Sequence, residues 1–285
     1  MKGDGEVGGA PEASRMIDHP YLMSEHSPAG YRWLRLARPE RRNALDVDLM
    51  VAVRDAIAAE PETLVLLGSA DPQVFCAGAD LTISDSERSI VSDLIYDCCE
   101  TMITRPGPVV SVITGPAVGG GAQLAAASDL RIAGRGARLR WIGPPGPGLG
   151  AGPGPGLDAG PGAGLGAASG PGLAVGAWLL PDLAGRGAAM DLVLTGRWVE
   201  AAEALALGLV NRVTDDPERD AEQLAADLAA RAAAAGVKAV MAAGGLLDRL
   251  RAEREVNRAA WARVLGARPA GRGPAPAGCG PAPAR

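Results

Sequence analysis

The residues best placed for chemistry lie in the stretch 114–133, where three consecutive glycines at 119–121 precede Gln123 and an apolar helical segment. A mostly β-branched run at 109–114 leads into these glycines. Glycine has no side chain, so backbone N–H groups at the start of a helix can point into a cleft. Such groups can hold a phosphate, a carboxylate or the negative charge that develops on a thioester carbonyl.

Two nucleotide-binding motifs fail on this stretch. A dinucleotide fingerprint that starts at Gly119 needs glycine at its sixth position, where the chain has Leu124. A P-loop needs lysine after its last glycine, and the chain has only Lys2 and Lys238. Two interpretations of the turn remain open at this point: an anion-holding turn, or a glycine-rich turn that only lets a helix pack closely on a strand.

A second segment, 63–81, has the same character, because an apolar strand at 63–68 runs into a turn of small residues at 73–81. Two such turns can converge. Together they resemble the crotonase superfamily, also called the enoyl-CoA hydratase/isomerase family, and residues 38–45 and 194–213 match two further segments of that family in the expected order. The resemblance covers about 30–141 and 172–235.

The resemblance implies an oxyanion hole made by the backbone N–H groups of Ala79 and Gly120. It also implies a lining for the CoA thioester, made by Arg42, Ala44, Ala77, Asp80 and Leu81. The alternative for all of these residues is plain turn and core packing. For Asp80 in particular, a capping role in the turn is favoured over a role as an acid.

The two glutamates that family hydratases use are missing from their expected positions. Gln123 stands at the first, and the second, after the strand at 138–141, falls on Gly143 or Leu165 when the family pattern is counted from either side. Asp158 is the only acidic residue in the Gly/Pro-rich insertion at 143–173 and is a weak candidate for a displaced acid. An amide exchanges no proton at neutral pH, and each positioned acid or base contributes about 10²- to 10⁴-fold to a rate. We therefore expect something other than a standard two-glutamate hydratase.

Three functions stay open on this sequence. The first is a protein of fatty acid metabolism that binds a CoA thioester and polarises its carbonyl, as a lyase or as an isomerase that moves a double bond. The second is a non-catalytic acyl-CoA-binding protein. The third is a folded relative whose pocket has been lost. The sequence leaves open whether the protein is an enzyme.

The fold class that the resemblance implies is α/β, a crotonase-like ββα spiral core followed by a helical C-terminal region that trimerises. The hydropathy pattern agrees, since a strand begins at Tyr31, Asp46 caps a helix, a strand covers 63–67 and a helix covers 88–105. We expect a disordered leader at 1–29, a core at 30–213 with a Gly/Pro-rich insertion at 143–173, a helical region at 214–268, and a disordered tail at 269–285.

Composition limits the partners. The net charge is −5 with no basic cluster, which argues against nucleic acid, and no apolar run is long enough to span a bilayer. We expect a cytoplasmic homotrimer or dimer of trimers with a CoA thioester as its ligand and no separate cofactor. The only histidines, His19 and His26, are N-terminal, so a zinc site or a His-dependent triad is not expected. Cys76 is expected to be a small buried residue and not a nucleophile.

Overall fold

The computed structural model describes residues 19–142, 175–229, 237–238, 240–241 and 245–266 of the 285-residue chain. Six strands form the main sheet, in the order β1 (Leu22–His26), β2 (Tyr31–Leu36), β3 (Leu64–Ser69), β4 (Val109–Ile113), β6 (Leu130–Gly134) and β9 (Arg212–Thr214). The β1 and β2 strands pair antiparallel, and the remaining neighbours pair parallel.

The inner strands of this sheet, β2, β3, β4 and β6, are buried on both faces. Side chains of β2 and β3 alternate between two hydrophobic clusters, as the twofold period of a strand requires. One cluster holds Trp33 and Leu66 together with residues of α6 (Pro217–Ala229), and the other holds Leu34 and Leu67 together with residues of the helices described next. Apolar runs with no polar alternation are typical of strands covered on both sides.

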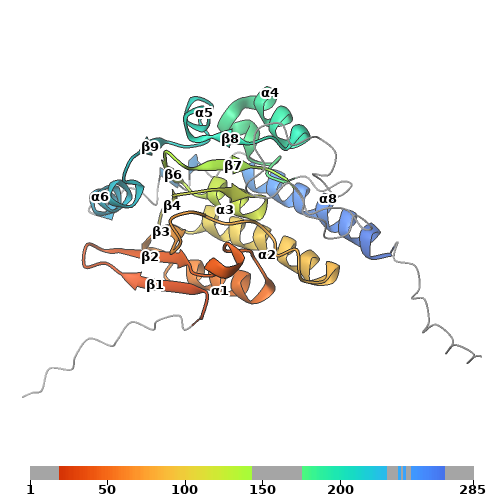
Figure 1. The fold of residues 1–285 in the computed structure, drawn as a ribbon, viewed down its shortest axis with the longest axis horizontal. Coiled ribbons are helices and arrows are strands. Elements are labelled where there is room, and N and C mark those ends of the chain that lie inside the picture. Colours follow the sequence, from red (N-terminus) through yellow and green to blue (C-terminus); the bar gives the residue numbers. More distant parts are fainter. Residues whose placement is uncertain (1–18, 143–174, 230–236, 239, 242–244, 267–285) are drawn as a thin grey trace, which may run out of the picture.

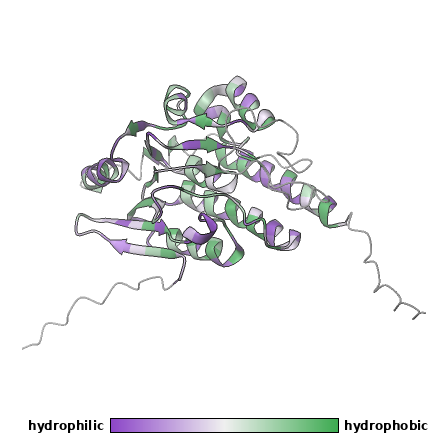
Figure 2. Cartoon of the chain, viewed as in Figure 1, coloured by the Kyte–Doolittle hydropathy of each residue, from purple (hydrophilic) through white to green (hydrophobic). Residues whose placement is uncertain are grey.

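The remaining helices pack mainly on the second cluster or around its ends. They are α1 (Val47–Ala59), α2 (Asp85–Thr104), α3 (Gly120–Ala127), α4 (Leu180–Thr195), α5 (Ala201–Ala206) and α8 (Leu246–Gly266), with a short 3₁₀ turn at Pro39–Arg41. Figure 1 shows α2 and α8 side by side, although more than 140 residues separate them in the sequence. In Figure 2, polar and apolar residues alternate around α6 and α8, as expected for helices with one face on the core.

A second, smaller sheet leads the chain into α3. It contains β5 (Ala117–Val118), β7 (Arg138–Arg140) and β8 (Val199–Glu200), in that order. The short β5 ends at Val118, two residues before Gly120, the first residue of α3. The second sheet therefore sets where the glycine-rich turn begins.

Most sequence-based expectations for these elements are confirmed. The protein is mixed α/β, and the C-terminal region is helical in α6 and α8. The Asp46 side chain caps α1, accepting a hydrogen bond from the Leu49 N–H at 2.9 Å. The α2 helix begins three residues earlier than predicted, because Ser84 and Glu87 form a reciprocal capping box.

The predicted leader is wrong in part. Residues 22–26 of the expected disordered segment 1–29 form β1, while residues 1–18 lie outside the described part of the chain. The strand was missed because only Leu22 in it is fully buried, and its order comes from backbone pairing with β2. The predicted insertion at 143–173 and tail at 269–285 also lie outside the described residues. None of the described helices combines the length and apolarity needed to cross a membrane.

Candidate functional site

Backbone hydrogen bonds hold the first predicted turn in place. The N–H of Leu45 donates to the carbonyl of Gly78 at 2.8 Å, and the N–H of Asp80 donates to the carbonyl of Leu45 at 2.9 Å. Ala79 lies between Gly78 and Asp80, which these two hydrogen bonds hold, and it is half-buried. Among the described residues, nothing accepts a hydrogen bond from the Ala79 N–H.

The second predicted turn is held in the same way. The N–H of Val118 donates to the carbonyl of Cys76 at 2.9 Å, and the N–H of Gly119 donates to the carbonyl of Arg140 at 2.9 Å. Gly119 adopts φ 52° and ψ −116°, a conformation that favours glycine. Gly120 then opens α3, and its N–H also finds no acceptor in the part of the chain that the structure describes.

The two turns lie against each other. A Cβ at Gly78 would lie 2.8 Å from the Val118 carbonyl oxygen and 3.7 Å from the Gly120 nitrogen. A Cβ at Gly121 would lie 2.6 Å from the Cβ of Cys76. The structure thus brings together the two turns that the sequence singled out. Close packing against Cys76 explains the glycine at 121. It does not account for the Ala79 and Gly120 N–H groups, which have no acceptor among the described residues.

The predicted CoA-lining residues lie on the first turn and on the neighbouring loop at 38–45. The Ala77 N–H donates to the carbonyl of Arg42 at 3.0 Å, which ties the loop at 38–45 to the first turn. Arg42 is exposed, and its φ of 53° is in the left-handed region. Ala44 is buried and Leu81 is 46% exposed. Their contact with a ligand stays a prediction.

Asp80 acts as an anchor of the turn. Its carboxylate accepts hydrogen bonds from the N–H and the hydroxyl of Thr82, at 2.9 and 2.7 Å, and forms an ion pair with Arg38 at 3.1 Å. Burial opposes ionisation of this carboxyl, but the Thr82 hydrogen bonds and the Arg38 charge outweigh it and hold its pKa below the ordinary value. The capping role expected from the sequence fits this geometry.

Gln123 is 5% exposed, and its Oε1 atom is buried without a partner among the described residues. Cys76 is fully buried, and burial raises the pKa of its thiol to about 12, so it is no nucleophile at neutral pH. Asp158, the candidate displaced acid, lies outside the described residues. No group of residues suited to a metal ion occurs within the described ranges.

The sequence did not single out a buried carboxyl group on α8, which contacts Tyr96 of α2. Glu253 of α8 is 7% exposed, and its carboxylate accepts hydrogen bonds from the Tyr96 hydroxyl at 2.9 Å and from the N–H groups of Gly176 and Trp178 at 3.0 and 2.6 Å. Asn257, one helical turn later, donates to the same Tyr96 hydroxyl. The sequence feature that could have revealed Glu253 is an acid and an amide at helical spacing on the apolar face of an amphipathic helix. The buried residues of that face include Leu250, Glu253, Asn257, Ala260 and Val264.

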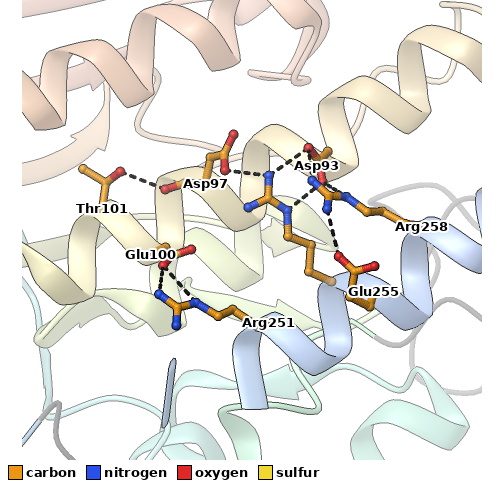
Figure 3. A network of polar contacts seen from close by, with 8 residues as sticks. Asp93, Asp97, Glu100, Thr101, Arg251, Glu255 and Arg258 are labelled. Atoms are coloured by element: carbon orange, nitrogen blue, oxygen red, sulfur yellow. Dashed lines mark hydrogen bonds and ion pairs between the residues drawn. The ribbon is translucent and has the colours of Figure 1, made fainter. Parts of the chain in front are cut away.

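A cluster of ion pairs fastens α8 to α2 on the outer side of this contact (Figure 3). Arg254 and Arg258 share the carboxylate of Asp93, and Arg254 also reaches Asp97 at 2.6 Å. The hydrogen bond from Arg254 is the main cause that lowers the pKa of Asp93 to about 2. Arg251 reaches Glu100 at 2.7 Å. These pairs fix the helix that carries Glu253.

A cavity of about 330 Å³ lies between α2 and α8. Ile90, Leu94 and Trp261 supply apolar walls, and Tyr96 and Asn257 supply polar atoms. Tyr96 therefore lines the cavity and donates a hydrogen bond to Glu253. The remaining lining includes Asp93, Arg254 and Arg258 of the ion-pair cluster, and no residue of the two turns lines this cavity.

Comparisons with known proteins agree with the resemblance. The sequence model of the enoyl-CoA hydratase/isomerase family matches residues 28–159. A putative enoyl-CoA hydratase/isomerase of Bacillus subtilis is 34% identical over 208 residues, covering 69% of this chain and 71% of that protein. A crotonyl-CoA hydratase of Syntrophomonas wolfei is 32% identical over 197 residues, covering 65% of this chain and 66% of that protein. A solved enoyl-CoA hydratase from Bacillus anthracis is 26% identical with a TM-score of 0.65, covering 86% of this chain and 91% of that chain.

Proposed function

Because the chain belongs to the enoyl-CoA hydratase/isomerase family, we propose that it binds a CoA thioester and polarises its carbonyl between the N–H groups of Ala79 and Gly120. The single observation that carries this proposal is that both N–H groups, on two turns in contact, have no acceptor among the described residues. Preorganised donors of this kind stabilise the negative charge that develops on a carbonyl oxygen.

The residues around the turns argue against ordinary hydration by two acids. Addition of water needs a base for the water and an acid for the α-carbon. Gln123 supplies neither, because an amide exchanges no proton at neutral pH. A reaction that relies on carbonyl polarisation and on fewer proton carriers suits this site better, which favours double-bond isomerisation within the family.

Two substitutions at one position test the role of the Gly120 N–H. Gly120→Ala adds a Cβ that meets the flexible end of Ile95, and it keeps the N–H. Gly120→Pro adds a comparable Cβ and removes the N–H, and the first residue of a helix tolerates proline. We expect the proline variant to turn over enoyl-CoA about 10²- to 10³-fold more slowly than the alanine variant. Equal rates in the two variants would contradict the proposal.

A second experiment separates an enzyme from a non-catalytic acyl-CoA-binding protein. Gln123, an amide where family hydratases have a glutamate, is compatible with such a binder. Native mass spectrometry with a short and a long enoyl-CoA reports the bound ligand and its mass. A bound ligand with no turnover in the unsubstituted protein would identify a binder. Failure to bind any CoA thioester would identify a relative without a working pocket.

We also propose that the protein is a homotrimer or a dimer of trimers. Met190 and Leu194 of α4 and Leu205 of α5 are exposed apolar side chains of the C-terminal half, as expected where copies of a chain associate. The masses from the native experiment test this assembly directly. A cytoplasmic location stays a prediction.

A further inference from the structure

The N–H groups of Ala79 and Gly120 share an apolar neighbour. Leu45 lies beside Ala79, because its N–H donates to the carbonyl of Gly78 at 2.8 Å and its carbonyl accepts from the N–H of Asp80 at 2.9 Å. The Leu45 side chain is fully buried, and its Cδ1 atom would lie 3.3 Å from a Cβ at Gly120. One apolar side chain therefore flanks both N–H groups.

A second apolar side chain, from α2, lies closer still to Gly120. The Cδ1 atom of the buried Ile95 would lie only 2.4 Å from a Cβ at Gly120. Because the Cβ and the N of one residue are about 2.5 Å apart, this methyl group lies within about 5 Å of the Gly120 nitrogen. An oxygen that accepts from the Gly120 N–H lies about 2.9 Å from the same nitrogen. The Ile95 methyl group is therefore a neighbour of any carbonyl held there.

Backbone atoms make other close contacts around the two turns. A Cβ at Gly78 would meet the carbonyl oxygen of Val118, and one at Gly119 would meet the carbonyl oxygen of Ile142, each at 2.8 Å. Such contacts cannot differ without a change of the backbone. Ile95 differs from these neighbours, because only its side chain makes the contact and its backbone belongs to α2, outside both turns. Its size can therefore vary while the two turns stay in place.

The exposed and the buried sides of the turns give a bound thioester its direction. Arg42 and Leu81, two of the predicted CoA-lining residues, are exposed, whereas Leu45 and Ile95 are buried. The phosphate groups of CoA carry charge, so the CoA part stays on the side that faces water. The acyl group is attached to the opposite side of the thioester carbonyl. Its α-carbon is then on the side of Leu45 and Ile95.

We propose that Ile95 restricts this site to CoA thioesters whose acyl chain is unbranched at the α-carbon, with Leu45 as a second wall. The inference rests on the proposed function, in that the N–H groups of Ala79 and Gly120 hold the carbonyl oxygen. A hydrogen on the α-carbon fits beside the Ile95 methyl group, whereas an α-methyl group competes for the same space. In a helix a β-branched side chain has one strongly preferred χ1 angle, so only the terminal methyl group of Ile95 can rotate away.

Two saturated CoA thioesters of identical composition test the restriction. Butanoyl-CoA is unbranched, while 2-methylpropanoyl-CoA has the same atoms with a branch at the α-carbon. Neither has a double bond that could be hydrated or moved, so isothermal titration calorimetry measures a Kd for each. We expect the unsubstituted protein to bind butanoyl-CoA at least about 10-fold more tightly, since one misplaced carbon in an apolar pocket typically costs about 10-fold or more.

A matched pair of variants assigns this preference to one methyl group. Ile95→Val removes only the Cδ1 atom that meets Gly120, and we expect the ratio of the two Kd values to fall by about 10-fold. Ile103→Val is the control, because Ile103 is also buried, lies near the C-terminal end of the same helix and loses the same carbon. Its ratio should equal that of the unsubstituted protein.

The outcomes separate this inference from the proposed function. Equal Kd values for the two isomers in the unsubstituted protein would overturn the restriction and leave the proposed function standing. A ratio that Ile95→Val leaves unchanged would also overturn it, as would a ratio that falls equally in Ile103→Val. Failure of the unsubstituted protein to bind either isomer would overturn both proposals together.

Discussion

Two regions of this molecule meet at α2, and they are built in opposite ways. The paired turns at 76–81 and 116–121 present backbone N–H groups, and glycines and backbone hydrogen bonds hold them. The contact between α2 and α8 presents side chains, which ion pairs and a buried carboxyl group hold. The first region has no group that titrates near neutrality, whereas the second has Glu253 with a pKa of about 7.

The difference shows what each kind of construction can do. Backbone donors polarise a carbonyl at any pH, because a peptide N–H neither gains nor loses a proton in the ordinary range. Transfer of a proton needs a side chain with a matched pKa. In this chain the two turns and Glu253 come from segments that are distant in sequence, so each can be changed without the other.

The largest expected effect is a pH dependence of stability that belongs to Glu253 alone. Its pKa is raised from 4.5 to about 7 by burial, so the folded state holds this proton more tightly than the unfolded state. The associated stability is fully present below about pH 4.5 and falls, by about 3 kcal/mol at most, as the pH rises through about 7. Urea unfolding near pH 5 and pH 8 should show this fall in the unsubstituted protein and not in Glu253→Gln. Parallel pH dependences in the two proteins would contradict the assignment.

The next effect concerns the turns. Gly121→Ala places a Cβ within 3 Å of the backbone oxygen and the side chain of Cys76, which cannot easily move, so we expect a loss of about 2 kcal/mol. The matched control is Gly187→Ala in α4, where nothing lies within 4 Å of the added atom. That change should stabilise the protein by about 0.5–1 kcal/mol. Denaturant unfolding measures both, and similar values for the two variants would refute the close packing at 121.

The smallest effect concerns the surface ion pairs of α8. Asp93→Asn removes the carboxylate that Arg254 and Arg258 share, and we expect a loss of about 1 kcal/mol, because these groups are partly exposed. Glu255→Gln, at a 70% exposed side chain, should be nearly neutral. The Asp93 contribution is present above its ordinary pKa of 3.8 and is lost as the pH falls through about 2. Thermal unfolding across this acid range measures it, and a loss above pH 5 would contradict this origin.

The same contrast explains what the sequence could predict. The turns were predictable because their determinants are local: glycines at 119–121, small residues around Ala79, and a strand before each turn. The Asp46 cap was predictable for the same reason. Glu253 was not, because it meets Tyr96 across 157 residues and nothing near it in sequence marks the contact. The β1 strand was missed since its order comes from pairing with β2 and not from its own hydropathy.

The three glycines at 119–121 also carry a consequence for how such a protein diverges. Each is constrained for a separate reason: a left-handed backbone at Gly119, the flexible side chain of Ile95 at Gly120, and Cys76 at Gly121. A larger residue at 120 fits if the residue at 95 becomes smaller. The two positions can therefore change as a pair. A replacement at 119 has no such partner, because its obstacle is the backbone itself. In a library of random variants, position 119 should remain fixed while 95 and 120 change in concert.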